Sequence, residues 1–399
     1  MIEHKGEEEF LSGEIQFLGR ILLQASSPPG GAPSGFVNLY CRFKSGIAEL
    51  FYRNDQGAER DLSASGGGAV SSVFGRTGAV AAVATDYPFY TPSLIPGGRI
   101  TLTSATPILS SDVTGATSIY YALYLHDRVP IYDGTNWVMT AFTELTNTTT
   151  DNTKNPAAVG ANSNYDLFVW NDSGTLRLGR GPAWSSATAR GTGAGTTELE
   201  RVNGIWMNKN AITNGPGADR GTYVGTVRSN GSSAIDWIAT PAAAAGGALC
   251  TLGVWNTYNR VLSSALCRSS DSSWTYASAI WQAFNNSATQ RVNFILGLNE
   301  DEITGQVSTF ISVDGVSSNA RISVGLDATN AMGQLANVVY EASGSSAYLE
   351  QTPRWQGLAG IGFHFLAPLE YAAAGTITNY GNAGQVGVTQ TGFYVAGRF

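Results

Sequence analysis

Short runs of hydrophobic and β-branched residues alternate with clusters of Gly, Asn, Asp and Ser along most of the chain. Runs of this kind, bounded by turn formers, predict β-strands joined by tight turns. The clearest predicted strands are residues 36–43, 47–52, 119–125, 165–170, 222–227, 291–296, 307–313 and 392–395. Residues 7–23 have room for one or two amphipathic helical turns, and no other segment keeps a helical apolar period.

Dipeptides that tolerate a positive φ angle mark the expected hairpin turns. Asn-Gly and Asp-Gly suit the two central positions of tight hairpin turns. They occur at Asp133-Gly134, Asn203-Gly204, Asn230-Gly231 and Asp314-Gly315. Lys44-Ser45-Gly46 predicts a three-residue hairpin loop, and residues 198–207 predict a strand–turn–strand unit.

Three stretches rich in small residues or proline divide the chain. They are residues 63–68, 91–98 and 241–247. Flexible, weakly hydrophobic stretches of this kind join folded units. The sequence therefore predicts an N-terminal β-hairpin region over residues 1–70, a linker over 71–96, a middle β-domain over 97–240 and a C-terminal β-domain over 241–399. The fold class is all-β, and we expect the last domain to be a jelly-roll-like sandwich.

Composition and charge exclude several classes of protein. Only 13% of the 399 residues are charged, while 48 are glycine and 11% are aromatic, which disfavours coiled coils and simple disorder. The net charge of −7 gives no basis for binding nucleic acid. No apolar run approaches the length of a membrane-spanning helix, and the acidic N-terminus differs from a signal peptide. Three scattered cysteines are too few for a disulfide framework.

Two stretches resemble bacteriophage virion proteins, especially tail fibres. Val70-Ser71-Ser72-Val73-Phe74-Gly75-Arg76-Thr77-Gly78-Ala79-Val80, followed by Asp86-Tyr87, looks like a linker that recurs in phage fibre and spike proteins. The upstream pattern, with Ser27-Pro28-Pro29, Leu39-Tyr40 and Leu50-Phe51-Tyr52, resembles the N-terminal part of such proteins. Residues 97–399 are similar to a module that follows such linkers in phage and prophage proteins. This similarity indicates a shared lineage and implies no mechanism.

The resemblance implies a structural and adhesive role in a virion, after synthesis in the cytoplasm of the bacterial host. It implies a homotrimeric fibre or spike that attaches to another virion protein of the tail, collar or capsid through residues 1–70. The C-terminal domains would contact a glycan or protein of the host surface, with no nucleic acid partner and no membrane insertion. Two alternatives stay open: a head fibre, capsid or collar decoration protein, and a polysaccharide-degrading tailspike enzyme.

No motif predicts a catalytic, metal or cofactor site. His126-Asp127 has no second histidine nearby, and residues 299–302 form an acidic stretch without EF-hand spacing. His364 lies in a strand-like segment, and no nucleophile elbow occurs. We therefore expect no enzyme and no cofactor.

Glycan binding and glycan cleavage need different residues. Cleavage needs two carboxylates about 5 to 10 Å apart. The candidates are Asp166, Glu198, Glu200, Asp219 and Asp236, which the sequence does not pair. Binding uses aromatic faces with amide and charged side chains around them. Trp170, Trp184, Trp255 and Tyr258 are the candidate glycan contacts, and Trp274 and Trp281 are further tryptophans of this kind. Most large aromatic side chains are expected in sandwich cores.

Overall fold

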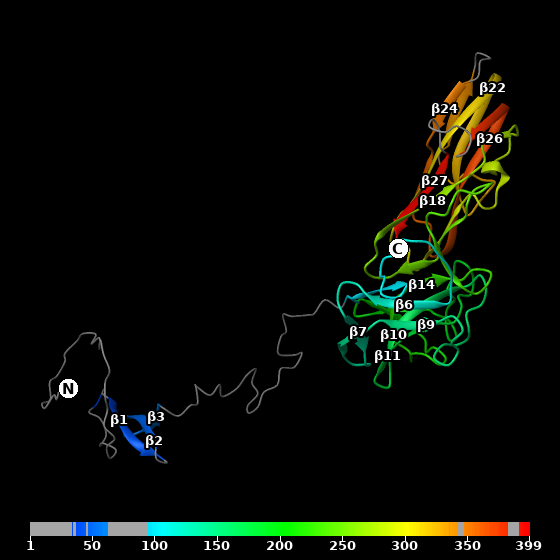
Figure 1. Ribbon diagram of the computed structural model, residues 1–399. Helices are drawn as coiled ribbons and strands as arrows, with labels where there is room; N and C mark the ends of the chain where they lie inside the picture. Colours follow the sequence, from blue (N-terminus) through cyan, green and yellow to red (C-terminus); the bar gives the residue numbers. More distant parts are fainter. Residues whose placement is uncertain are drawn as a thin grey trace, which may run out of the picture. The chain divides into compact units, whose positions relative to one another are not determined.

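The computed structural model describes residues 34, 37–44, 47–62, 95–334, 336–341, 347–381 and 391–399. The chain forms two compact units, Met1–Thr91 and Pro92–Phe399 (Figure 1). The predicted helical turns at residues 7–23 and nearly all of the predicted linker lie outside the described residues. The first unit contains part of the predicted anchoring region, and the second contains both predicted β-domains.

The described part of the first unit is a small antiparallel sheet in the order β1-β2-β3. Its strands are β1 (Val37–Lys44), β2 (Ile47–Asn54) and β3 (Glu59–Asp61). Tyr40 and Phe51, which face each other across β1 and β2, are buried, with ring centroids 5.9 Å apart. The hairpin was predicted, but the three-residue loop is wrong, because Lys44 belongs to β1 and pairs with Ile47.

One end of the second unit is a lobe of three sheets (Figure 1). The six-stranded sheet consists of β10 (Asn164–Asp172), β11 (Thr175–Arg180), β12 (Leu199–Val202), β13 (Ile205–Asn208), β14 (Gly221–Arg228) and β17 (Val254–Asn256). The smaller sheets consist of β4 (Gly98–Thr101), β6 (Ser118–Leu123) and β9 (Leu145–Thr148), and of β7 (Arg128–Tyr132) and β8 (Trp137–Ala141). Strand β10 is buried from Asn164 to Trp170 because neighbouring layers cover both its faces.

The other strands of the second unit form a single sheet. They are β5 (Val113–Ala116), β15 (Ile235–Ile238), β16 (Cys250–Leu252), β18 (Leu262–Arg268), β19 (Ser273–Tyr276), β20 (Gln282–Ala283), β21 (Val292–Leu296), β22 (Ile303–Leu326), β23 (Asn337–Glu341), β24 (Ala347–Gln351), β25 (Arg354–Gly357), β26 (Gly362–Tyr380) and β27 (Gly392–Arg398). The predicted boundary at residue 241 falls between β15 and β16, which pair with each other. The sheet therefore runs across that boundary.

Strand β22 folds over to form two layers of a sandwich. Its first half pairs with β25, β27, β24 and the end of β26, and its second half pairs with β23 and the earlier part of β26. A Cβ atom on Gly305, in the first half, would lie 2.8 Å from a methyl carbon of Leu366, which pairs with Leu326 in the second half. The two halves therefore face each other across a core that includes Val307 and Ile322.

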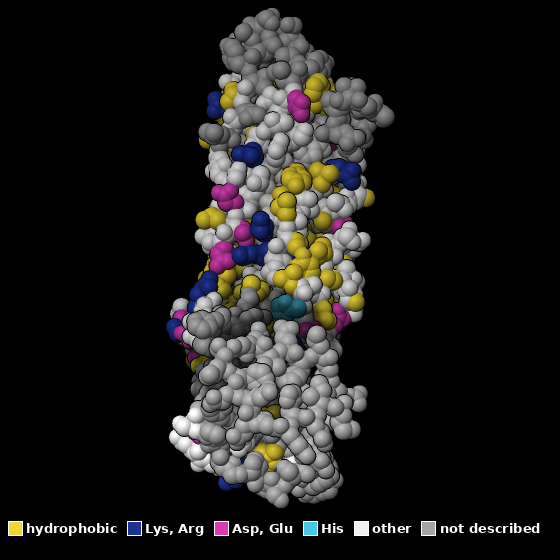
Figure 2. All heavy atoms as spheres, turned by 90° about the vertical axis from the view of Figure 1, so that its left-hand side faces the viewer, with side chains coloured by type: hydrophobic (Ala, Val, Ile, Leu, Met, Phe, Trp, Pro, Cys, Tyr) yellow, Lys and Arg dark blue, Asp and Glu magenta, His cyan; other side chains and the backbone are white. Residues whose placement is uncertain are grey.

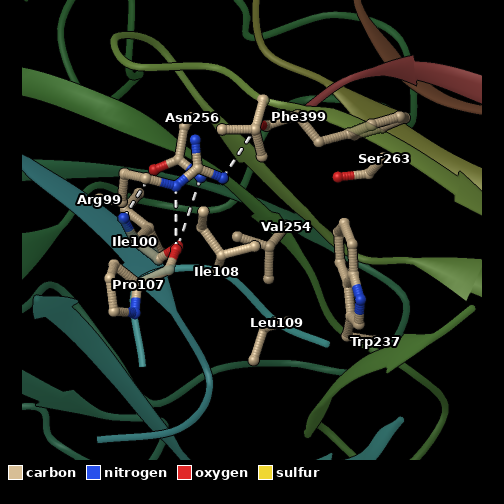
Figure 3. A pocket seen from close by; sticks show the side chains of 11 residues that line it. Arg99, Ile100, Pro107, Ile108, Leu109, Trp237, Val254, Asn256, Ser263 and Phe399 are labelled. Carbon is tan, nitrogen blue, oxygen red and sulfur yellow. Dashed lines mark hydrogen bonds between the residues drawn. The ribbon is translucent and has the colours of Figure 1, made fainter. Parts of the chain in front are cut away.

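The buried Arg99 joins this sandwich to the lobe (Figure 3). Its Nε donates to the carbonyl of Pro107 at 2.9 Å, one Nη to Phe399 at 3.0 Å, and the other Nη to Asn259. The space that remains beside Arg99, Trp237 and Phe399 is about 10 Å³, which is room for about one water molecule at most. This junction is packed and leaves no room for a ligand.

Most of the predicted turns are confirmed. Asn203 and Gly204 have φ angles of 49° and 93° and form a two-residue hairpin turn between β12 and β13. Asp133-Gly134 lies in the β7–β8 hairpin, and Asn230-Gly231 lies in the turn between β14 and β15. The predicted hairpin turn at Asp314-Gly315 is wrong, because Asp314 pairs with Thr376 inside β22. The adjacent strand β26 continues alongside, so the irregularity is a bulge in the ladder.

The predicted all-β fold class is confirmed. In the described part of the chain the helical structure is a single 3₁₀ turn, Phe284–Asn286. Within those residues, no helix has the length and the hydrophobic character needed to cross a bilayer. The predicted strands at residues 119–125, 165–170, 222–227 and 291–296 correspond to β6, β10, β14 and β21.

Candidate functional site

Three of the four aromatic residues predicted to contact a glycan are buried. Trp255 is 0%, Trp184 6% and Trp170 8% exposed. Trp184 packs under the guanidinium of Arg190 at 4.3 Å. Tyr258 is half-buried, and its hydroxyl accepts a hydrogen bond from the backbone N–H of Trp206 at 3.2 Å. These rings pack mainly against the protein, so other residues are better placed to contact a ligand.

Trp170 does reach one shallow polar hollow of the lobe. The hollow has a volume of about 260 Å³, and Tyr132, Asn171 and Arg220 also line it. Arg220 lies over the Tyr132 ring at 5.5 Å. Since Trp170 itself is 8% exposed, it contributes an edge and not a face that a sugar ring could stack on.

The carboxylates that the sequence left unpaired have separate environments. Asp166 is completely buried and binds Arg190 through two hydrogen bonds of 2.7 and 3.1 Å, which is a structural ion pair of the interior. Glu200 and Asp219 come together, and their mutual hydrogen bond, the largest cause, raises the pKa of Glu200. A pair in direct contact is closer than the spacing that glycosidic cleavage needs.

The larger candidate site is a groove formed by two hollows of about 360 and 480 Å³, the first over β21 and β26 and the second beside β20. Arg291 lines both hollows, so they adjoin at this side chain. The first hollow also includes Arg228, Asn293 and Phe363. The second includes Trp281 and several amide side chains. We call this surface the Arg291 groove.

The register of the sheet brings the residues of the first hollow together. Asn293 of β21 faces Phe365 of β26 and Thr251 of β16, so these three side chains share one face. Residues two apart on a strand also share a face, which adds Arg291 and Phe363. The guanidinium of Arg291 lies 4.6 Å from the ring of Phe365.

Arg228 enters the same hollow from the end of β14. Its guanidinium lies 4.3 Å from the ring of Phe363, and one Nη donates to the Asn164 side chain at 2.9 Å. Burial lowers the pKa values of both Arg228 and Arg291 below the usual arginine value. The carboxylate of the hollow is Asp236, which accepts hydrogen bonds from Gly115 N and from the Asn230 side chain at 2.7 and 2.9 Å.

The second hollow has an aromatic wall. The Trp281 ring is half-buried and lies 5.2 Å from Tyr371, centroid to centroid. Gln282 is held by Glu370, which accepts its amide at 2.8 Å. Glu370 is fully buried, and burial raises its pKa to about 7, against the effect of the N–H groups that it accepts.

The other chemical candidates have protein partners. His364 binds Asp327 at 2.7 Å and lies within β26. In the acidic stretch at 299–302, Glu300 and Asp301 both pair with Arg260. Across the described ranges, no three His, Cys, Asp or Glu residues are placed to hold a metal ion. Cys250 and Cys267 are buried and unpaired.

Hydrophobic side chains also reach the surface away from the groove. Figure 2 shows one face of the molecule, where they lie in several groups between charged side chains. On β18 and β27, Leu262 is 74% and Tyr394 41% exposed. Tyr394 and Leu266, which pair across these strands, line a hollow of about 330 Å³. The apolar outer face of β18 and β27 consists of these three side chains, and Arg268, Gln306 and Ser308 line the hollow beside them.

Sequence reasoning named Trp281 as a glycan-binding type of residue but missed Arg228, Arg291 and Asn293. A weak signal was present in Phe363-His364-Phe365, whose alternation predicts two aromatic rings on one face of a strand. The partners of those rings could not be read from the sequence, because they lie on β14 and beside β21.

Comparisons with known proteins do not assign a family. No protein-family model matches the sequence, and no curated protein matches it. Among solved structures, the chain is similar to dimeric latent PorU from Porphyromonas gingivalis, with 12% identity and a TM-score of 0.22. The similarity covers 60% of this chain and 24% of the PorU chain.

Proposed function

We propose that this protein is a structural and adhesive component of a bacteriophage virion, a homotrimeric fibre or spike. Residues 1–70 attach it to another virion protein, and the unit Pro92–Phe399 presents the Arg291 groove to a glycan of the host surface. The fibre-type linker at residues 70–80 supports the virion role. The groove supports the adhesive role.

The observation that carries the adhesive role is the composition of the groove. Trp281 and Phe363 supply ring surfaces, and Asn286, Asn293 and Asn330 supply amide groups. Apolar ring surfaces combined with a few placed polar groups are what a sugar, with its C–H faces and hydroxyls, requires. Three copies on one fibre would strengthen weak individual contacts through multivalency.

The arrangement favours binding over cleavage. Among the described residues that line the groove, Asp236 is the carboxylate, and both of its oxygens already accept hydrogen bonds. Hydrolysis of a glycosidic bond uses a pair of carboxylates across the bond. Glu200 and Asp219 are in direct contact with each other, so they do not leave the space that a glycosidic bond needs between two carboxylates. They also do not line the groove.

The apolar outer face of β18 and β27 supports self-association. Leu262 and Tyr394 lose contact with water when another copy covers this face. Exposed apolar groups of this kind commonly mark protein interfaces. Light scattering on the full-length chain measures the mass, and we expect that of three chains.

The adhesive role is tested by binding of the labelled full-length trimer to host cells. We expect saturable binding that disappears on an isolate without its surface polysaccharide. Trp281→Ala should weaken binding about tenfold, because stacking on an aromatic ring contributes roughly 1 kcal/mol or more. Tyr124→Ala is the matched control, since Tyr124 is 37% exposed and does not line the groove.

Equal binding by Trp281→Ala and the unaltered chain would remove the groove from the proposal. Absence of any saturable binding by a folded trimer would favour the alternative of a head fibre, capsid or collar decoration protein. Release of reducing ends from the host polysaccharide would favour the tailspike enzyme.

A further inference from the structure

Arg228 and Arg291 differ from ordinary surface arginines in their lack of acidic partners. The ion pairs of the described residues include neither of them. Arg228 has one side-chain hydrogen bond, to the amide oxygen of Asn164. The Nε of Arg291 is buried and has no acceptor among the residues that the structure describes. Neither cation is therefore neutralised by a carboxylate of the described residues, and the Nη atoms of Arg291 have no acceptor among those residues.

Each guanidinium lies over the ring of a phenylalanine. Arg228 lies over Phe363 and Arg291 over Phe365, at 4.3 and 4.6 Å from the ring centroids. The two rings are alternate residues of β26, so both cations lie along the same face of the sheet. A guanidinium packed against an aromatic ring can still donate hydrogen bonds to an oxyanion through its Nη atoms.

Partial burial makes an anion favourable at this place. Both arginines have pKa values lowered by desolvation, which means that the charged form lacks compensation from water. Asp236 lines the same hollow, but it accepts hydrogen bonds from Gly115 and Asn230. Two cations and one carboxylate leave one positive charge to be neutralised in the first hollow.

Asn293 indicates what else the ligand carries. Its side chain is 8% exposed, and its Oδ1 has no donor within the described structure. A buried acceptor without a donor costs about 1–3 kcal/mol, so a ligand that donates to it is favoured. A hydroxyl group donates, whereas a fully ionised phosphate or sulfate only accepts. A ligand that combines an oxyanion with hydrogen-bond donors, such as hydroxyl groups, therefore fits both the arginines and Asn293.

From these observations we propose that the Arg291 groove binds an acidic saccharide. A carboxylate of one sugar unit binds between Arg228 and Arg291, a neighbouring hydroxyl donates to Asn293, and the next units lie along the second hollow against Trp281. This inference rests on the proposed adhesive function and adds the class of glycan.

The test compares one oligosaccharide with and without its carboxylates. The full-length chain is titrated with oligogalacturonate, with a sialylated oligosaccharide, and with oligogalacturonate whose carboxyl groups have been reduced to alcohols. We expect at least one acidic oligosaccharide to bind and the reduced one to bind at least about tenfold more weakly. Inorganic phosphate is the probe for an anion that carries no sugar, and we expect it to compete poorly.

Variants connect the binding to the named residues. Arg291→Ala and Arg228→Ala should each weaken binding of the acidic oligosaccharide about tenfold or more and leave weak binding of the reduced one unchanged. Asn293→Asp keeps the side-chain shape and places a negative charge beside the carboxylate, so it should also weaken acidic binding. Arg177→Ala is the control, because Arg177 is 40% exposed and pairs with Asp172 on β10. Circular dichroism confirms that each variant is folded.

Each of the other possible results would contradict one part of this proposal. Equal affinity for acidic and reduced oligosaccharides would overturn the acidic class and leave the adhesive function standing. Phosphate binding as tight as that of the acidic oligosaccharide would overturn the saccharide and leave an anion site. No binding of any acidic oligosaccharide by a chain that binds host cells would place the receptor site elsewhere, whereas failure of both experiments would remove the adhesive function as well.

Discussion

Arg180, the last residue of β11 in the lobe, and Arg291, which directly precedes β21 in the groove, belong to the same unit but differ in their surroundings. Arg180 is 1% exposed, and its two Nη atoms donate to Asn147 and to the carbonyls of Thr148, Thr149, Asp151 and Ala157. The Nε of both arginines lacks an acceptor in the described structure, but Arg291 is half-buried and its Nη atoms make no hydrogen bond to the described residues either. Because five acceptors of the protein bind this one arginine, Arg180 holds the segments that carry them together.

The same difference separates Arg99 from Arg228. The three guanidinium nitrogens of Arg99 each donate to a carbonyl oxygen, and the space beside it is closed (Figure 3). Arg228 has one protein acceptor and faces a hollow of about 360 Å³. Buried polar groups are normally satisfied by the protein itself. Arginines that are stacked in place but lack acceptors, beside an open hollow, are therefore the better candidates for binding a ligand.

The largest expected effect comes from removing Arg180, whose two Nη atoms have five protein acceptors. Arg180→Met removes the side-chain donor to Asn147 and to the carbonyls of Asp151 and Ala157, and leaving a buried acceptor unpaired costs about 1–3 kcal/mol. We expect the free energy of unfolding to fall by about 3–5 kcal/mol, measured by denaturant titration. The control is Arg177→Met on the same strand, where an exposed pair with Asp172 is lost and a change below about 1 kcal/mol is expected. Equal losses in the two variants would mean that the acceptors around Arg180 are satisfied without it.

How much of the fold and of the candidate site could be predicted depends on how far apart in the sequence the interacting residues are. Strands and most turns follow from local alternation and from Asn-Gly or Asp-Gly pairs, and these predictions were confirmed at Asn203-Gly204. The burial of Trp170 also has a local signal, because residues 165–170 lack the alternation of a half-exposed strand. Asp166 interrupts that run, and only its ion pair with Arg190, in a later loop, explains why it is buried.

The groove and the folded-over strand depend on contacts between distant parts of the chain. Asn293 faces Phe365, and Gly305 packs on Leu366, across separations that no local pattern encodes. Asp314-Gly315 shows the same limit, since a turn-forming pair was overruled by the pairing of β22 with β26. Local propensity limits the structures that a segment can form, and pairing with neighbouring strands selects one of them.

A buried acid gives the next largest effect, through pH. Glu370 accepts N–H groups from Trp274, Gln282, Asn285 and Asn379, yet burial raises its pKa from 4.5 to about 7. Between these values the folded chain holds a proton that the unfolded chain has released. Stability should therefore fall as the pH rises from about 4.5 to about 7, by at most about 3 kcal/mol, and level off above that range.

Glu370→Gln tests this dependence because the amide does not titrate. Denaturant titrations across the pH range should show a smaller slope for the variant than for the unaltered chain. The level of stability is expected to change as well, since an amide cannot accept as many N–H groups as a carboxylate. The slope is therefore the measurement that matters, and identical slopes would show that Glu370 stays ionised in the folded chain.

The smallest expected effect is the one that separates the two kinds of arginine most clearly. Arg291→Met keeps a long side chain over Phe365 and removes a desolvated cation that has no acidic partner in the described structure. No protein acceptor of its side chain is lost, so the free energy of unfolding should stay within about 0.5 kcal/mol or rise slightly. Comparison with Arg180→Met in the same denaturant titration then separates the two kinds of arginine by the loss in free energy of unfolding that each substitution causes. A loss above about 2 kcal/mol for Arg291→Met would instead assign Arg291 to the interior framework, and its place in a binding groove would need another explanation.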